Sequence, residues 1–148
     1  MSDEEFKELM SMQKHINDDK ISLPTAGELG KQICATSDST SDVFILDLDR
    51  RGTISLNKKK IQERHGNSQT KMIRLEVDAP PHTNPDGTLL SRNHIHIYSE
   101  QYGMSMAYEL DTFHETLFKD TSNFLSIFYD FCSYCNINVE NLQIQGVI

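Results

Sequence analysis

The stretches KMIRLEVD (residues 71–78) and NHIHIYSE (residues 93–100) each alternate apolar with polar side chains. Because successive side chains on a strand point to opposite faces, this alternation predicts two half-buried β-strands. The segment between them, residues 79–93, contains three prolines and the run Asn84-Pro85-Asp86-Gly87, so it is expected to be an irregular loop. Together the three segments predict a long antiparallel hairpin.

Further elements follow from local patterns. Ser2 and Glu5 form a capping box, which predicts a helix over Asp3–Asn17. Near the other end, SNFLSIFYDFCSYC (residues 122–135) places its aromatic residues on one helical stripe, with caps expected within residues 120–122. The segment SMAYEL (residues 105–110) predicts one more strand.

The region before residue 71 is less regular. A short helix is expected over Glu28–Ile33, among glycines and a proline. VFILDLD (residues 43–49) has strand composition, and Arg51-Gly52 after it reads as a turn. We therefore predict a hairpin that pairs Val43–Asp49 with Thr53–Asn57, whose second arm can continue into Lys58–Arg64.

These elements predict the α+β class. The expected architecture is an antiparallel sheet of four to five strands, with an N-terminal helix and a C-terminal helix packed on its apolar face. The 148 residues suit one domain, 1–148, and show no linker or repeat.

Composition bounds the function. No apolar run is long enough for a transmembrane helix, and the acidic start MSDEEFKE is unlike a signal peptide, so a cytoplasmic protein with no membrane partner is expected. The three cysteines, an odd number, argue against a disulfide framework. Cys132 and Cys135 form a C-x-x-C, but they lie in an aromatic helix and are interpreted as buried apolar residues.

One polar cluster stands out on the predicted hairpin. His94, His96 and Tyr98 share one face of their strand, and Arg74 and Glu76 form a second row on the neighbouring strand. His82 lies in the loop above them. Such a cluster could cleave RNA without a cofactor by acid–base catalysis, with the arginine stabilising the phosphorane charge. The candidate catalytic residues are Arg74, His82, His94, His96 and Tyr98.

Two other interpretations of this cluster stay open. His94 and His96 with a carboxylate could hold a divalent metal. The spacing H-x-H-x-x-x-E, ending at Glu100, resembles the first metal motif of cupins, although the later histidine of their second motif is absent. Alternatively, the face is simply solvated and PPHTNPDG is a well-ordered turn.

The net charge of −8 is unevenly distributed, and it suggests two kinds of partner. Local basic residues could meet RNA or a nucleotide, and acidic residues after Ser99 could dock on a host protein complex. The candidate nucleic-acid contacts are Arg50, Arg51, Lys58, Lys59, Lys60 and Arg64. The candidate partner contacts are Glu100, Glu109, Asp111, Glu115 and Asp120.

The segment from Arg74 to Gly103 resembles an uncharacterised family of small bacterial and phage proteins. The matching residues are Arg74, Pro80, Pro81, His82, Asn84 to Gly87, His94, His96, Tyr98, Tyr102 and Gly103. The resemblance implies a bacterial or phage origin and carries no established activity. Together with the polar cluster and the charge distribution, it leaves two hypotheses in host–phage conflict: an RNA- or nucleotide-directed phosphodiesterase, or a non-enzymatic inhibitor of a host defence complex. Met104-Ser105-Met106 stands where the family pattern implies charged and aromatic residues, which suggests lost activity and retained binding.

Overall fold

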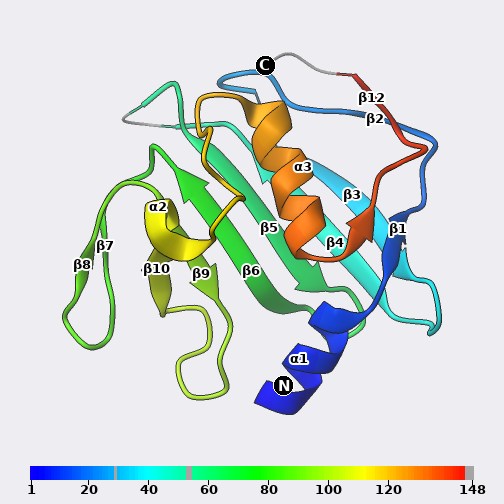
Figure 1. Ribbon diagram of the computed structural model, residues 1–148, viewed down its shortest axis with the longest axis horizontal. Coiled ribbons are helices and arrows are strands. Elements are labelled where there is room, and N and C mark those ends of the chain that lie inside the picture. Colours follow the sequence, from blue (N-terminus) through cyan, green and yellow to red (C-terminus); the bar gives the residue numbers. More distant parts are fainter. Residues whose placement is uncertain (29, 53–54, 146–148) are drawn as a thin grey trace.

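A computed structural model describes residues 1–28, 30–52 and 55–145. Its centre is one eight-stranded sheet, in the order β10-β9-β6-β5-β4-β3-β1-β11 (Figure 1). Neighbours run antiparallel, except that β11 runs parallel to β1. The strands are β1 (Lys14–Ile16), β3 (Lys31–Ser37), β4 (Val43–Asp49), β5 (Lys59–His65), β6 (Thr70–Val77), β9 (His94–Ile97), β10 (Ala107–Glu109) and β11 (Ile137–Asn138).

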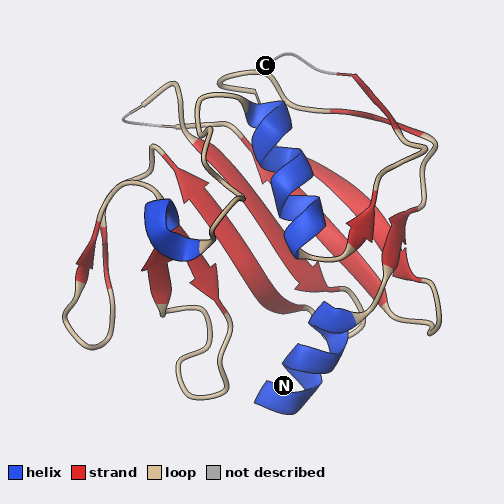
Figure 2. Ribbon diagram, in the orientation of Figure 1, coloured by secondary structure: helices blue, strands red, loops and turns tan. Residues whose placement is uncertain are grey.

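The α+β class and the antiparallel sheet are therefore confirmed, while the expected four to five strands were too few. Smaller elements complete the chain (Figure 2). They are α1 (Asp3–Ser11), α2 (Leu110–Phe113), α3 (Phe124–Tyr134), β2 (Lys20–Ser22) paired with β12 (Gln143–Gln145), and β7 (His82–Thr83) paired with β8 (Leu89–Leu90). No helix within the described ranges is long and apolar enough to cross a membrane.

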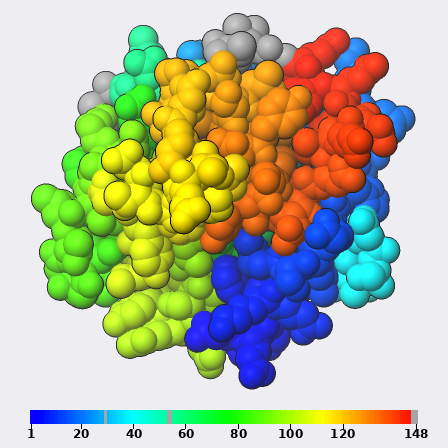
Figure 3. All heavy atoms as spheres, viewed as in Figure 1, coloured from blue at the N-terminus to red at the C-terminus, as the bar shows by residue number. Residues whose placement is uncertain are grey.

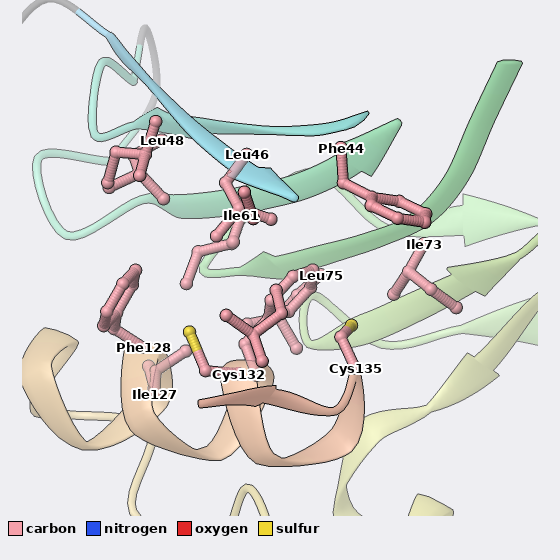
Figure 4. Close-up of a cluster of buried hydrophobic side chains, with 14 of the residues drawn as sticks. Phe44, Leu46, Leu48, Ile61, Ile73, Leu75, Ile127, Phe128, Cys132 and Cys135 are labelled. Carbon is pink, nitrogen blue, oxygen red and sulfur yellow. The ribbon is translucent and has the colours of Figure 1, made fainter. Parts of the chain in front are cut away.

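One face of the sheet carries the hydrophobic core. Alternation sends Ile73, Leu75 and Val77 of β6 to this face, together with Ile95 of β9. Helix α3 lies across it and directs Ile127, Phe128 and Cys132 at the strands (Figure 4). In the space-filling view, α3 and its flanking segments cover the middle of the molecule on this side (Figure 3). The predicted C-terminal helix on the apolar face is confirmed.

The helix ends differ from the prediction. Asn123, rather than a residue of 120–122, caps α3 by accepting a hydrogen bond from the Ser126 amide at 3.0 Å. Ser2 caps α1 as expected. However, α1 ends at Ser11 instead of Asn17, because β1 begins at Lys14 and pairs with both β3 and β11. A helix there would leave β11 without its partner in the sheet and β3 paired only with β4.

Of two local predictions before residue 71, one is wrong and the other is confirmed in part. The expected short helix over Glu28–Ile33 is replaced by β3, whose Ile33 and Ala35 are buried against the core; Leu29 lies outside the described residues. The strand β4 pairs antiparallel with β5, so the predicted continuation of the second arm into Lys58–Arg64 is confirmed. In the predicted arm Thr53–Asn57, Leu56 and Asn57 form a turn instead of a strand, and Thr53 and Ile54 lie outside the described residues. Sheet pairing and burial override the local turn signals at both places.

Candidate metal centre

The second face of the sheet is polar, and its residues line up across the strands. Arg74 of β6 is the register partner of His96 on β9, and Glu76 is the partner of His94. Across β5 the same two rows continue with Gln62 opposite Arg74 and Lys60 opposite Glu76. Paired residues in an antiparallel sheet project to the same side. The two polar rows expected from the alternation are therefore present.

The two strand histidines are not open to solvent. His94 is 1% exposed and His96 2% exposed. The ring of His82, from the β7–β8 ribbon, lies over both, with centroid distances of 4.6 Å to His96 and 5.6 Å to His94. Asn84 anchors this ribbon by pairing its side-chain amide with the backbone of Ala107 at the edge strand β10. The loop expected over residues 79–93 thus contains a short ribbon that buries the site.

Each of the three histidine rings uses one nitrogen to hold a backbone carbonyl. His94 Nδ1 donates to Ser91 O at 2.9 Å, and His96 Nδ1 donates to Met104 O at 2.7 Å. His82 Nε2 donates to Ser105 O at 2.8 Å. Because a carbonyl oxygen only accepts, these bonds place a proton on the named nitrogen. In a neutral ring, the other nitrogen of His82 or His96 keeps its lone pair available. The other nitrogen of His94 instead meets the Glu76 carboxylate at 2.9 Å.

Glu76 lies between the remaining nitrogens. Its Oε2 is 2.9 Å from His94 Nε2 and 3.4 Å from His96 Nε2, and its Oε1 is 3.7 Å from Arg74 Nε. Burial raises the pKa of this carboxyl, but the hydrogen bond with His94, the close approach of His96 and the Arg74 charge outweigh burial and hold the pKa well below its usual range. Burial lowers the pKa of His94, and the bond to Glu76 outweighs it, so that pKa is raised. Glu76 is therefore a carboxylate.

Glu76, His94 and His96 offer ligand atoms that lie within 4.8 Å of one another. Two imidazoles and a carboxylate suit Zn²⁺ or a non-haem Fe²⁺. The backbone bonds at the opposite ring nitrogens are the kind that orient metal-binding histidines in other proteins. Sequence reasoning named Glu100 as the cupin-type carboxylate, but it is exposed in a turn where its amide binds Asp3. The cross-strand register was the signal for Glu76.

The eight-stranded open sheet also differs from the two packed sheets of a cupin, so the cupin resemblance does not extend to the fold.

The candidate residue Tyr98 follows the end of β9, and its side chain contacts the N-terminal region. Its hydroxyl donates to the Met1 carbonyl, and its ring lies 5.8 Å from that of Phe6. In the described part of the chain, Tyr98 makes no hydrogen bond to the histidines.

The six basic residues do not form one surface. Arg50 and Lys59 are buried, with the Arg50 guanidinium 4.9 Å from the Phe124 ring centre. Arg51 pairs with Asp49 at 2.8 Å, and Arg64 pairs with Asp47 at 2.9 Å. Lys58 and Lys60 are half-buried. Among the six, Lys60 lies directly beside the candidate site, as the register partner of Glu76.

The acidic set is also divided. Glu109 accepts a hydrogen bond from Ser91 Oγ at 2.8 Å, and Asp120 accepts one from Ser122 Oγ at 2.6 Å. Asp111 and Glu115, between these two residues in the sequence, are exposed, and Glu100 lies in the turn after β9.

The Met104-Ser105-Met106 segment contacts the site through its backbone, because two of its carbonyl oxygens accept hydrogen bonds from His96 and His82. The identities of those side chains therefore matter less to the site than their backbone path.

Comparisons with known proteins place the chain only at the level of a family. No curated protein and no solved structure matches it significantly. A model of a family of unknown function, DUF6978, matches residues 1–137 of the 148. The chain belongs to the DUF6978 family.

Proposed function

We propose that the protein binds one divalent metal ion through Glu76, His94 and His96 and uses it on a small ligand. The observation that carries this proposal is the set of hydrogen bonds from His82, His94 and His96 to three backbone carbonyls. Such bonds fix the tautomer and orient the second ring nitrogen, which is what a metal ligand needs. A bound ion of this kind supplies a Lewis acid that polarises a ligand oxygen or a water.

The same geometry weighs against acid–base cleavage of RNA by the histidines alone. Without a metal, both nitrogens of His94 are engaged within the protein, by Ser91 and by Glu76, and a bound metal would take the place of the proton between His94 Nε2 and Glu76. His94 and His96 are almost completely buried, so a long RNA strand cannot bring its 2′-hydroxyl within the hydrogen-bond distance that proton transfer requires. A metal bound between Glu76 and the histidines could still act on a ligand that reaches the more exposed side of Glu76.

Metal binding is tested by metal content after incubation with Zn²⁺ and desalting. Wild type should retain about one equivalent, and His96→Ala and Glu76→Gln each less than about 0.1, because either change removes one of three ligands. His15→Ala is the matched control. His15 lies on β1, far from the candidate site in the sheet, and its half-exposed side chain pairs with Asp38. This variant should bind metal as wild type does.

The readout is inductively coupled plasma mass spectrometry, with circular dichroism to establish that each variant is folded. Glu76→Gln keeps the shape of the side chain, so it separates loss of a ligand from loss of structure. Wild-type protein without bound metal would rule out the proposal. So would equal loss of metal in His15→Ala and His96→Ala.

A further inference from the structure

Three buried polar atoms without a hydrogen-bond partner fall in one row across the sheet. They are Gln62 Oε1 on β5, Arg74 Nε on β6 and His96 Nε2 on β9, considering partners within the described residues. The last two have only long contacts with the Glu76 carboxylate, at 3.7 Å and 3.4 Å. Gln62 is the register partner of Arg74, and Arg74 is the register partner of His96. Buried polar groups in folded proteins are normally hydrogen-bonded, and an unpaired one destabilises the fold. Three in adjacent positions indicate a missing ligand.

The chemical types of these atoms describe that ligand. His96 Nε2 offers a lone pair for the proposed metal, as argued above. Arg74 Nε is a charged donor, and its carboxylate neighbour Glu76 Oε1 is 3.7 Å away, beyond hydrogen-bond distance, so an anionic ligand oxygen would satisfy it. Gln62 Oε1 is an acceptor, and its orientation is fixed because the Nε2 of the same amide donates to Asp47 at 3.2 Å. Gln62 therefore requires a donor, such as a hydroxyl, on the same ligand.

The surrounding charges favour a dianion over a monoanion. Lys60 and Arg74 lie on neighbouring strands of the same polar face, Lys60 opposite Glu76 and Arg74 opposite Gln62. The proposed metal adds two positive charges, against the single negative charge of Glu76. Arginine, lysine and a divalent metal together are the groups that bind phosphate oxygens in many proteins. A phosphate group fits this site better than a carboxylate.

A hollow for the rest of the ligand lies next to Lys60 on the same face. Its volume is about 230 Å³, and Gln32, Asp47 and Asp49 line it. The two carboxylates are already paired with arginines, Asp47 with Arg64 and Asp49 with Arg51. Their remaining lone pairs can accept hydrogen bonds from hydroxyl groups. The hollow therefore suits a polyhydroxylated group that continues from the phosphate.

We propose that the candidate metal centre binds a sugar phosphate ester, with the phosphate held by Arg74, Lys60 and the metal and a sugar hydroxyl donating to Gln62. This inference rests on the proposed metal site and deepens it. A free sugar phosphate and a nucleotide present the same chemistry to these residues. The side chains of Arg74 and Glu76 are 22% and 17% exposed, so the ligand would approach over them, from the side that His82 does not cover.

The test is isothermal titration of the Zn²⁺-loaded protein with ribose 5-phosphate, adenosine 5′-monophosphate, inorganic phosphate, ribose and acetate. The first two should bind more tightly than inorganic phosphate, and ribose and acetate should not bind measurably. Arg74→Gln should weaken ribose 5-phosphate binding by about 10- to 100-fold, the range expected for one lost charge-assisted hydrogen bond. Tighter binding of the nucleotide than of ribose 5-phosphate would identify nucleotides as the source of the sugar phosphate.

Two further variants make the test specific. Gln62→Met removes the acceptor at similar volume, so it should reduce the preference for ribose 5-phosphate over inorganic phosphate while leaving inorganic phosphate binding unchanged. Arg92→Gln, at an exposed loop arginine, is the control and should bind like wild type. Normal metal content in Arg74→Gln establishes that the metal site has survived.

The outcomes separate this inference from the proposed function. Normal metal content without binding of any phosphate compound would overturn the sugar-phosphate inference and leave the metal site standing. Equal affinity for acetate and phosphate compounds, or equal loss in Arg92→Gln and Arg74→Gln, would overturn it too. Absence of metal from the wild type would overturn both.

Discussion

Phe128→Ala is expected to lower the free energy of unfolding by about 3–5 kcal/mol, the usual cost of removing a buried phenyl ring and leaving a cavity. Phe128 is 0% exposed and points from α3 toward the sheet (Figure 4). The strands beneath α3 belong to one continuous sheet and cannot easily collapse into the space. Urea unfolding followed by circular dichroism measures the change, with the slope on urea concentration expected to stay constant.

Tyr129→Ala is the matched control for this helix. Tyr129 is the next residue of α3 and is 43% exposed, so the same truncation should cost less than about 1 kcal/mol beyond any helix-propensity effect. The difference between the two variants isolates burial from helix formation. Similar losses for both would show that α3 is stabilised mainly by its own helical structure and does not anchor the core.

The helices and strands that could be predicted are those in which apolar and polar residues follow a regular period along a single element. The α3 stripe and the alternation in β6 and β9 identify both the element type and its buried side. The sequence of β5 misleads because its buried positions include Lys59, Glu63 and His65, which local pattern reasoning assigns to solvent. β1 was missed for a similar reason, since the Lys14 side chain is completely buried and donates to three backbone carbonyls.

The candidate site likewise has features that the sequence predicts and features that it does not. Two polar rows follow from the alternation and from a hairpin connection, so the approach of Arg74 and Glu76 to the two strand histidines was predictable. Their burial was not, because it depends on His82 and Asn84 folding back over residues that are distant in sequence. The basic residues were grouped by sequence, whereas neighbours along a strand alternate between faces, which separates buried Lys59 from Lys60.

Glu63 is the most unusual of these buried charges. It lies on the apolar face of β5, is 0% exposed, and has neither carboxyl oxygen hydrogen-bonded to a nitrogen or hydroxyl within the described residues. Burial raises its pKa from 4.5 to about 7, although the nearby Lys14 ammonium and a contact with the Cys135 thiol lower it. Burial also raises the pKa of Cys132 and that of Cys135 well above the usual thiol value, so both stay thiols.

This pKa predicts a specific dependence of stability on pH. The folded protein keeps a proton on Glu63 between pH 4.5 and about 7, where the unfolded chain has lost it. Stability from this group is therefore complete below pH 4.5 and is lost as the pH rises through 7. The raised pKa corresponds to a loss of about 3 kcal/mol between pH 4.5 and pH 8, at roughly 1.4 kcal/mol per pKa unit.

Glu63→Gln isolates this contribution, because glutamine has a similar shape and does not ionise. The free energy of unfolding of Glu63→Gln minus that of wild type should rise by about 3 kcal/mol from pH 4.5 to pH 8. Taking the difference cancels the titration of groups common to both proteins. Urea unfolding at four or five pH values in this range measures it.

Glu8→Gln, at an exposed position of α1, is the control and should leave the difference from wild type constant over the same pH range. Lys14 stays in both Glu63 proteins, held by the carbonyls of Met10, Met12 and Cys135, so its packing is retained in the variant. A difference that is flat within about 0.5 kcal/mol would mean that Glu63 titrates in the folded protein as it does in the unfolded chain. A difference that falls with pH would mean that the attraction of Lys14 outweighs burial and keeps Glu63 ionised.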